Sequence, residues 1–337
     1  MSKSKSLLIA GIMTGMLLAV FLWNQKHSEP EHTEIIQEQP LRFGVFRGDA
    51  GALAWVAQDQ GYFVKHQVSV DFQSYTTGKR TLSDVQTGQL DLATSSEFVF
   101  VNQTLTPTDL QIVGNIATFR THNLIVRNDR NIQQPSDLKG KKIGLIKGTG
   151  GEFGLNRFLI RNGLSGNDLD LIDLPASQLE HKLETGEMDA VMTWQPVGYQ
   201  ILQKMGDQVS VMKGTNEQEF YFVLVARQDW IVKHVEELHR VLYALNDAEN
   251  FIRLHPDEFR KILARQFELT DDYITDLSGR SQYTLDMPQA LILAMEDEAQ
   301  WLMESNPDAG MVLPNYLKMI SLDAMQQVKP EAITLIR

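Results

Sequence analysis

The residues that could bind a charged ligand in this sequence gather around two glycine-rich turns. One turn lies in Arg42–Gly51 (RFGVFRGDAG) and the other in Lys142–Gly151 (KIGLIKGTGG). Each stretch is typical of a short apolar strand, a tight turn and the start of a helix. The first N–H groups of a helix have no partner within it, and the positive end of its dipole favours anions. Gly148–Gly151, directly before Glu152, is therefore the first candidate for an anion-binding turn.

Hydroxyl and aromatic side chains near the ends of other predicted strands supply further candidates. Thr94, Ser95 and Ser96 would either contact a ligand or only cap the helix that follows them. Trp194 and Gln195 end another strand, where the indole offers a stacking face for a ligand or packs against neighbouring structure. Both alternatives remain open for each group at this point.

Charged residues near these turns have both signs, which bears on the charge of the ligand. The acidic side chains are Asp49, Glu97 and Glu152, and the basic ones are Arg47, Arg120 and Lys147. A purely anionic ligand would not need the carboxylates, whereas a zwitterion or a nitrogen heterocycle could use both signs. Each charge could equally be a solvated surface group. Phe46 would face either the ligand or the sheet. Tyr221 and Phe222 would serve either in packing at a hinge or in ligand contact.

The elements that position these residues form an internal repeat. The phrase Thr-Gly-x-x-Asp occurs at Thr87–Asp91 and again at Thr185–Asp189. Around it, the pattern predicts the order strand, helix, strand, helix, strand twice, which implies parallel sheets with right-handed crossovers. After the opening strands, the predicted elements of the two copies are Ala52–Gln60, Val68–Phe72, Lys79–Gln86 and Leu92–Thr94, then Glu152–Arg161, Leu169–Leu174, Ser177–Glu184 and Ala190–Thr193. Because ligands bind beyond the carboxyl ends of such strands, we expect both copies to face one cleft.

Composition excludes several functions. The chain has 337 residues, a formal net charge of −12 and no cysteine. The negative charge argues against coating of nucleic acid, which needs clustered Lys and Arg. Without cysteine there is no disulfide framework, no Cys-ligated zinc and no thiol nucleophile. Neither a metalloprotease, a serine-hydrolase nor a P-loop motif is present, so we expect no catalytic residues, no metal and no cofactor.

The N-terminal 40 residues are expected to lie outside the fold. Lys3 and Lys5 precede an uncharged stretch, Leu7–Trp23, and a polar spacer follows to Pro40. This pattern is typical of an export signal or of an uncleaved single membrane anchor, and both remain open. Either one directs the bulk of the chain across the membrane.

Four segments resemble a known family. They are LRFGVFRGDAGALAWVAQDQGYFVKHQVSVDF, TLSDVQTGQLDLATSSE, DLKGKKIGLIKGTGGEFGLNRFL and LETGEMDAVMTWQP, within Leu41–Arg227. By these segments the chain resembles periplasmic solute-binding proteins of the nitrate/sulfonate/taurine ABC importer type, the group of SsuA/THI5-like proteins. The resemblance implies an α/β fold of the type II periplasmic-binding-protein class, with two lobes joined by two crossing strands. It places lobe one at 41–122 and 223–337 and lobe two at 123–222.

The resemblance also implies a function. A small polar or anionic molecule would be captured between the lobes, outside the cell membrane, and delivered to ABC permease and ATPase subunits, with no chemical turnover and with the chain acting as a monomer. One alternative is a sensor that presents ligand occupancy to a membrane signalling partner. Another is binding or synthesis of a thiamine pyrimidine precursor, although the enzymes of that branch carry a Cys-rich motif that is absent here.

The strand ends and the resemblance together give one set of expected ligand-binding residues. These are Phe46, Asp49, Thr94, Ser95, Ser96, Gly148, Thr149, Gly150, Gly151, Glu152, Trp194, Gln195 and Tyr221.

Overall fold

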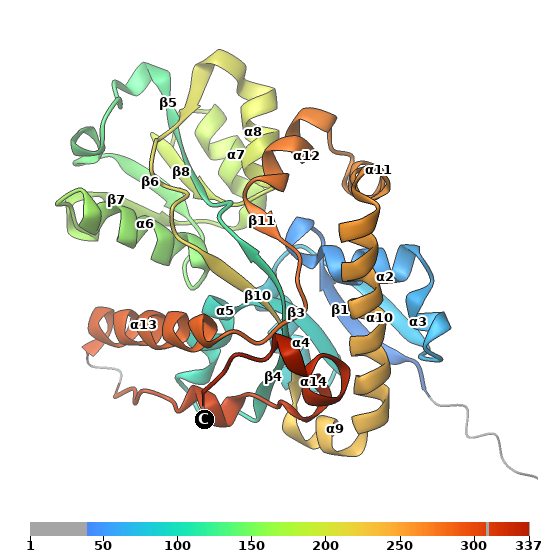
Figure 1. Cartoon of the computed structure of the whole chain (residues 1–337). Coiled ribbons are helices and arrows are strands. Elements are labelled where there is room, and N and C mark those ends of the chain that lie inside the picture. Colours follow the sequence, from blue (N-terminus) through green and yellow to red (C-terminus); the bar gives the residue numbers. More distant parts are fainter. Residues whose placement is uncertain (1–38, 308–309, 337) are drawn as a thin grey trace, which may run out of the picture. The chain divides into compact units, whose positions relative to one another are not determined.

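The structure is a computed structural model that describes residues 39–307 and 310–336 (Figure 1). All elements below belong to the compact unit Pro40–Arg337. The predicted apolar segment Leu7–Trp23 lies outside the described residues. Within the described part of the chain, no helix is long and apolar enough to cross a membrane.

The strands form two separate sheets. The six-stranded sheet has the order β11-β4-β10-β3-β1-β2, and the five-stranded sheet has the order β7-β6-β8-β5-β9. The strands of the first are β1 (Leu41–Phe46), β2 (Val70–Tyr75), β3 (Leu92–Ser96), β4 (Leu110–Phe119), β10 (Phe220–Arg227) and β11 (Ser281–Gln282). Those of the second are β5 (Asn123–Arg127), β6 (Lys142–Leu145), β7 (Asp170–Asp173), β8 (Ala190–Thr193) and β9 (Val209–Val211).

Helices follow the strands along the chain and dominate its C-terminal part. The helices up to β9 are α2 (Ala52–Asp59), α3 (Tyr62–Lys65), α4 (Gly78–Gln86), α5 (Glu97–Thr104), α6 (Gly150–Arg161), α7 (Ala176–Glu184) and α8 (Val197–Met205). The later ones are α9 (Gln228–Lys233), α10 (Val235–Leu254), α11 (Pro256–Phe267), α12 (Asp271–Ser278), α13 (Gln289–Ser305) and α14 (Asp323–Val328). A short 3-10 turn, η1 (Asp49–Gly51), precedes α2.

The predicted internal repeat is confirmed by the sheet topology. In the first sheet β1 lies between β2 and β3, and in the second β6 lies between β7 and β8, with all four pairings parallel. Each set of three is then joined by one antiparallel strand, β10 beside β3 and β5 beside β8. Several boundaries differ from prediction by one to three residues. β2 begins at Val70 rather than Val68, and α6 begins at Gly150 rather than Glu152 because the extended Thr149 already serves as its N-cap.

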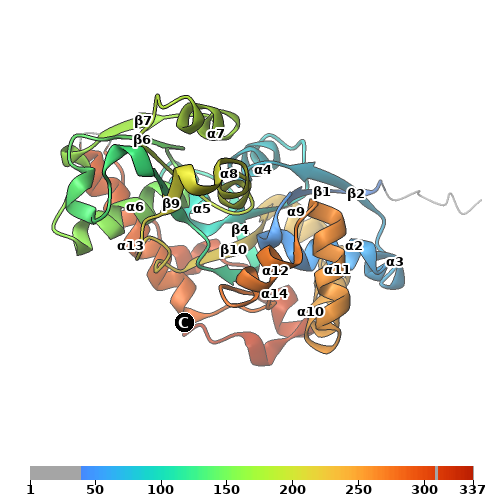
Figure 2. The ribbon, with the colours of Figure 1, turned by 90° about the horizontal axis from the view of Figure 1, so that it is seen from above.

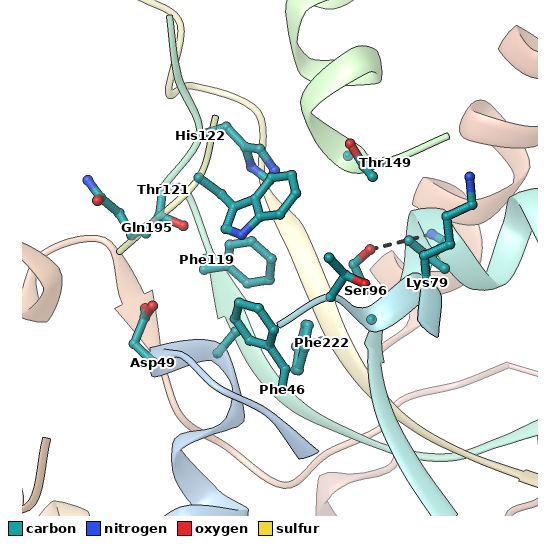
Figure 3. A pocket seen from close by; sticks show the side chains of 16 residues that line it. Phe46, Asp49, Lys79, Ser96, Phe119, Thr121, His122, Thr149, Gln195 and Phe222 are labelled. Atoms are coloured by element: carbon teal, nitrogen blue, oxygen red, sulfur yellow. Dashed lines mark hydrogen bonds between the residues drawn. The ribbon is translucent and has the colours of Figure 1, made fainter. Parts of the chain in front are cut away.

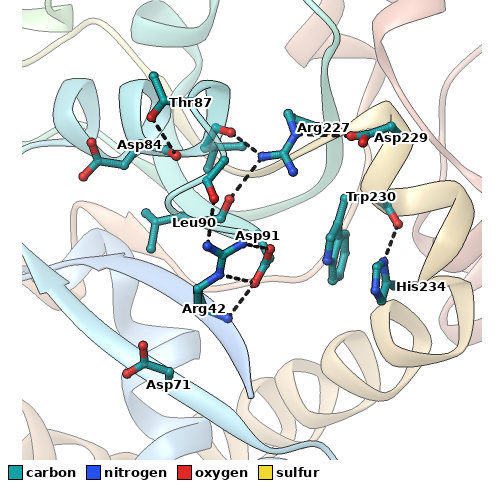
Figure 4. Close-up of polar contacts among 12 residues, drawn as sticks. Arg42, Asp71, Asp84, Thr87, Leu90, Asp91, Arg227, Asp229, Trp230 and His234 are labelled. Carbon is teal, nitrogen blue, oxygen red and sulfur yellow. Dashed lines mark hydrogen bonds and ion pairs between the residues drawn. The ribbon is translucent and has the colours of Figure 1, made fainter. Parts of the chain in front are cut away.

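The repeated Thr-Gly-x-x-Asp phrase lies at the end of each sheet where the parallel strands begin, opposite their carboxyl ends. Asp91 accepts a hydrogen bond from the Arg42 backbone N–H at 3.0 Å (Figure 4). In the second copy, Asp189 accepts one from the Lys142 N–H at 2.9 Å. The glycine of the phrase has a φ of +75° in both copies, which favours a residue without a side chain. The aspartates therefore fix the starts of the strands, and the expected ligand-binding residues lie at or beyond their other ends.

The chain passes between the sheets twice. The first passage joins β4 to β5 through residues 120–122, and the second joins β9 to β10 through residues 212–219. β10 is buried over nearly its whole length, as expected for an apolar strand (FYFVLVAR) in the interior of a sheet. The proposed lobe boundaries at 123 and 222 fall at or near these passages and remain a prediction.

The helix α13 connects the two sheets through side-chain contacts. Figures 1 and 2 both show α13 beside α6. The ring centroids of Phe153 on α6 and Trp301 on α13 lie 5.5 Å apart, and Arg157 forms an ion pair with Asp297. The hydrophobic core of the six-stranded sheet accordingly includes Phe153 from the helix that follows β6.

Candidate ligand-binding site

A cavity lies at the carboxyl ends of strands from both sheets (Figure 3). Its lining comes from the ends of β1, β3, β4 and β8, from the starts of α4 and α6, and from β10. The lining residues are Phe46, Asp49, Ala50, Thr77, Gly78, Lys79, Ser96, Val99, Phe119, Thr121, His122, Thr149, Gly150, Trp194, Gln195 and Phe222. The position agrees with the rule that ligands bind beyond the carboxyl ends of parallel strands.

Aromatic rings form the central wall of this cavity. The ring centroids of Phe46 and Phe222 lie 5.6 Å apart, and those of Phe119 and Phe222 lie 6.1 Å apart. The ring centroid of His122 lies 6.0 Å from that of Phe119 and 6.2 Å from that of Trp194. The rings come from segments far apart in sequence, so one apolar surface is assembled from both sheets.

Three helices begin at the cavity. Thr77 caps α4 by accepting a hydrogen bond from the Arg80 N–H at 3.4 Å, and Ser96 caps α5 by accepting one from the Val99 N–H at 3.4 Å. Thr149 is the N-cap of α6, although its hydroxyl donates to the Ile146 carbonyl at 2.7 Å rather than capping the helix. Because the first amides of a helix lack intrahelical partners, this side of the cavity offers N–H donors and three positive dipole ends.

Lys79 adds a full positive charge beside these helix starts. A Cβ placed on Gly148 would lie 3.6 Å from the Lys79 Nζ, so this side chain from α4 reaches the loop before α6. Its side chain is exposed, and no acidic group in the described residues forms an ion pair with it. We call Thr77, Lys79, Ser96, Thr149 and Gly150 the anion end of the cavity.

Gly150 has no room for a side chain at the start of α6. A Cβ there would lie 2.8 Å from the Cε1 atom of Phe220 and 3.4 Å from the Cε1 atom of His122. The glycine therefore lets the helix start approach the aromatic wall. Two residues earlier, in the loop before α6, the Gly148 N–H donates to the Glu152 carboxylate at 2.8 Å, so this amide is already satisfied.

Asp49 places a buried carboxylate on the cavity wall. It is 3% exposed and accepts a hydrogen bond from the Ser281 hydroxyl at 3.2 Å. Burial raises the pKa of Asp49 to about 6. Among the described residues, no Lys, Arg or His forms an ion pair with it. The carboxylate therefore lacks a cationic partner within the described protein.

His122 is held neutral by burial. Its pKa is lowered to about 3 by desolvation, and its Nδ1 atom has no hydrogen-bond partner in the described structure. Gln195 is fixed from one side because its Oε1 atom accepts the Tyr199 N–H at 2.9 Å. The Gln195 amide NH2 group is then the part of this side chain left to donate a hydrogen bond.

Glu97, at the start of α5, is buried beside the cavity without lining it. Its Oε1 atom accepts the Tyr221 N–H at 2.8 Å. Burial is the main cause that raises its pKa to about 8. The carboxyl is thus mostly protonated at neutral pH and adds little negative charge beside the cavity.

The expected ligand-binding residues separate into two groups in the structure. Those on the cavity wall are Phe46, Asp49, Ser96, Thr149, Gly150, Trp194 and Gln195. Those that do not line the cavity are Thr94, Ser95, Gly148, Gly151, Glu152 and Tyr221. Thr94 has a structural contact instead, because its hydroxyl accepts the Phe46 N–H at 2.9 Å and ties the ends of β1 and β3 together. The Tyr221 hydroxyl donates to Glu219 at 3.3 Å.

Several lining residues were not foreseen from the sequence. The polar ones are Thr77, Lys79, Thr121 and His122, and the aromatic one is Phe119. The Thr77–Gly78 pair after β2 gave a usable signal, since it repeats the strand-to-helix turn of the predicted anion site. Phe119 and His122 gave none, because their role depends on where β4 leaves its sheet.

A second, larger hollow continues outward from the cavity. Its volume is about 450 Å³, and it shares Phe46 and Trp194 with the inner cavity. Arg47 and Glu268 lie on its wall. Phe46 and Trp194 thus stand between an aromatic inner space and a polar outer one.

A family model described as "NMT1/THI5 like" matches residues 52–259, more than half of the chain. The chain belongs to this family. A relative from Brucella abortus (strain 2308), named only as a binding protein, is 24% identical over 67% of this chain and 71% of its own length. Another from Escherichia coli (strain K12), whose name describes it as an aliphatic sulfonates-binding protein, is 23% identical over 80% of this chain and 84% of its own length.

The solved structures give the fold. The alkanesulfonate-binding protein SsuA from Xanthomonas axonopodis pv. citri, bound to MOPS, superposes with a TM-score of 0.71. It is 20% identical, and the match covers 84% of this chain and 98% of that one. The chain therefore has the α/β periplasmic-binding-protein fold that its sequence predicted.

Proposed function

We propose that this protein captures a small oxyanion with an apolar body, of the sulfonate type, outside the cell membrane and delivers it to an ABC importer. The observation that carries the proposal is the cavity lined by both sheets, with three helix starts and Lys79 on one side and aromatic rings beside them. Helix starts and a cation suit an oxyanion, and aromatic rings suit the carbon body attached to it. The family and the sulfonate-binding relative support the same ligand class.

Ligand capture would work by bridging the two sheets. Thr149 and Trp194 come from the five-stranded sheet and its helices, whereas Phe46 and Ser96 come from the six-stranded one. A ligand that touches both sets stabilises the closed arrangement by as much as its affinity for that arrangement exceeds its affinity for an open one. The passages at residues 120–122 and 212–219 are the proposed hinges. The closed form would then dock on the permease.

Thermal unfolding of the full chain against a ligand panel tests this function. The panel contains alkanesulfonates, taurine, nitrate, bicarbonate, aminopyrimidines and amino acids. A ligand at 100 times its dissociation constant adds about 2.7 kcal/mol to the free energy of unfolding. We expect a raised midpoint with the sulfonates. A shift with aminopyrimidines alone, or with no compound of the panel, would contradict the proposal.

A further inference from the structure

We propose that the preferred ligand is a ring-bearing dipolar molecule, with an oxyanion at one end and an amino group at the other. This inference rests on the proposed function and narrows it to a class within the sulfonates. It starts from the separation of charged and polar groups along the cavity, with aromatic rings between them.

The two ends of the cavity have opposite character. Figure 3 shows Lys79, Ser96 and Thr149 on one side of the aromatic rings and Asp49, Thr121 and Gln195 on the other. We call the second group the acidic end. An oxyanion placed at the anion end meets helix amides and an ammonium group, and its far end then points toward the Asp49 carboxylate.

Within the acidic end, the Asp49 carboxylate is the group that would favour a ligand with a hydrogen-bond donor such as an ammonium group. Its carboxylate is buried, and its one side-chain hydrogen bond in the described structure comes from Ser281. A buried carboxylate without a cationic partner is costly, so a ligand ammonium group that reaches it gains the missing pair. A plain alkanesulfonate would leave that carboxylate facing an apolar chain.

The middle of the cavity favours a flat ring over a chain. Phe46, Phe119, Phe222 and Trp194 present rings from four different segments. Such surfaces pack against another ring by offset or edge-to-face contact, which adds to the gain from burial alone. A ring also holds its two substituents apart at a fixed distance, so both ends of the cavity are contacted without loss of chain flexibility.

Proton release provides an independent sign of the contact with Asp49. The other titratable groups around it are Tyr283, whose pKa is raised well above its usual value, and His122, whose pKa is lowered. Both stay neutral between pH 5 and 7, as does the buried Glu97. Asp49 is then the group that a bound ammonium group would deprotonate near pH 6.

The test is isothermal titration of the full chain with four sulfonates that vary ring and amine separately. They are 4-(aminomethyl)benzenesulfonate, 4-methylbenzenesulfonate, taurine and ethanesulfonate. We expect the first to bind tightest, with ring and amine each worth about tenfold in dissociation constant. At pH 6, in buffers of different ionisation enthalpy, only the amino compounds should release a proton.

Variants assign each preference to its end of the cavity. Asp49→Asn should abolish the advantage of the amino group and the proton release while keeping the advantage of the ring. Trp194→Leu should reduce the advantage of the ring while keeping the advantage of the amino group and the proton release. Asp71→Asn, at an exposed position of β2, is the matched control and should leave all four affinities unchanged. The unfolding midpoint of each variant confirms that it is folded.

The outcomes separate this inference from the proposed function. If none of the four sulfonates binds, the proposed function itself fails. If all four bind with similar affinity, the sulfonate function stands and the dipolar ring-bearing ligand is wrong. A gain from the amino group that survives Asp49→Asn would also overturn the inference.

Discussion

At the scale of single residues, the proposed site depends on two charged side chains that form no ion pair within the described part of the chain. Lys79 and Asp49 both border the cavity, and neither has an ion-pair partner in the described part of the chain. An uncompensated charge next to a cavity is a frequent sign of a ligand group of opposite sign. The two side chains therefore carry the charge selectivity of the proposed site.

Replacing Lys79 tests the charge at the anion end. Lys79→Gln should weaken sulfonate binding about fivefold, which corresponds to about 1 kcal/mol, because the ammonium group is exposed and partly screened. The salt dependence of the affinity should fall with it. Lys147→Gln removes the same charge from an exposed lysine that does not line the cavity, and serves as the control. Equal effects of the two substitutions in titrations would show that only net charge matters.

The buried Glu97 carboxyl leads to a prediction about how the free energy of unfolding depends on pH. Because its pKa is raised from 4.5 to about 8, the folded state retains a proton that the unfolded state has released, and stability is lost as pH rises through this window. Glu97→Gln should therefore lose less stability than the wild type between pH 5 and 8, at about 1.4 kcal/mol per unit of pKa shift removed.

Denaturant unfolding at several pH values measures this difference. Glu298 is also buried with a raised pKa, so some slope remains in both proteins. Glu304→Gln on the exposed surface of α13 is the control. Parallel stability profiles for the wild type and Glu97→Gln would contradict the assignment.

At the scale of elements, the start of α6 is the most constrained segment of the site. A Cβ on Gly150 would meet the Phe220 ring at 2.8 Å, whereas a Cβ on Gly154 would lie at ordinary contact distances of 3.5–3.6 Å. The two glycines share one helix, so they allow a direct comparison of close approach with helix propensity.

The two alanine substitutions should act in opposite directions. Gly150→Ala should destabilise the protein by about 1–3 kcal/mol through overpacking and should weaken ligand binding at the anion end. Gly154→Ala should be neutral or stabilise it by up to about 1 kcal/mol, because alanine is the better helix former. Denaturant unfolding compares the two. A stabilising Gly150→Ala would show that the helix start is not packed as described.

The elements were largely predictable from the sequence, and the cavity only in part. Periodicity and glycine turns gave both copies of the repeat to within three residues, because those signals are local. They also gave Phe46, Ser96, Thr149, Gly150 and Trp194, which follow predicted strands directly. The lining by Phe119 and His122 depends on the chain leaving one sheet for the other, which local patterns do not encode. Thr94 shows the opposite error. Its place at a strand end predicts contact with the ligand, but its hydroxyl accepts a hydrogen bond from the neighbouring strand β1 instead.

At the scale of the whole folded unit, α13 holds the two sheets against each other. Its Asp297 pairs with Arg157 of α6, and Trp301 packs on Phe153. If these contacts belong to the closed, ligand-binding arrangement, weakening them lowers the population of that arrangement and hence the apparent affinity.

Arg157→Gln should therefore weaken ligand binding about twofold to fivefold, in line with the worth of a partly exposed ion pair. Lys204→Gln on α8 is the control, because Lys204 pairs with Glu180 and Glu184 of α7, away from α13 and from both proposed hinges. X-ray scattering should show a larger radius of gyration for ligand-free Arg157→Gln than for the control. Unchanged scattering and affinity would mean that α13 plays no part in closure.

The most direct measurement of the central claim is a crystal structure of the full chain with the sulfonate that raises its unfolding midpoint most. The oxyanion should lie within hydrogen-bond distance of Ser96, Thr149 or the Gly150 N–H, with its carbon body against Phe46 and Trp194. A sulfonate bound elsewhere, for instance in the surface groove beside Val232 and Leu322, with the cavity empty, would contradict the account.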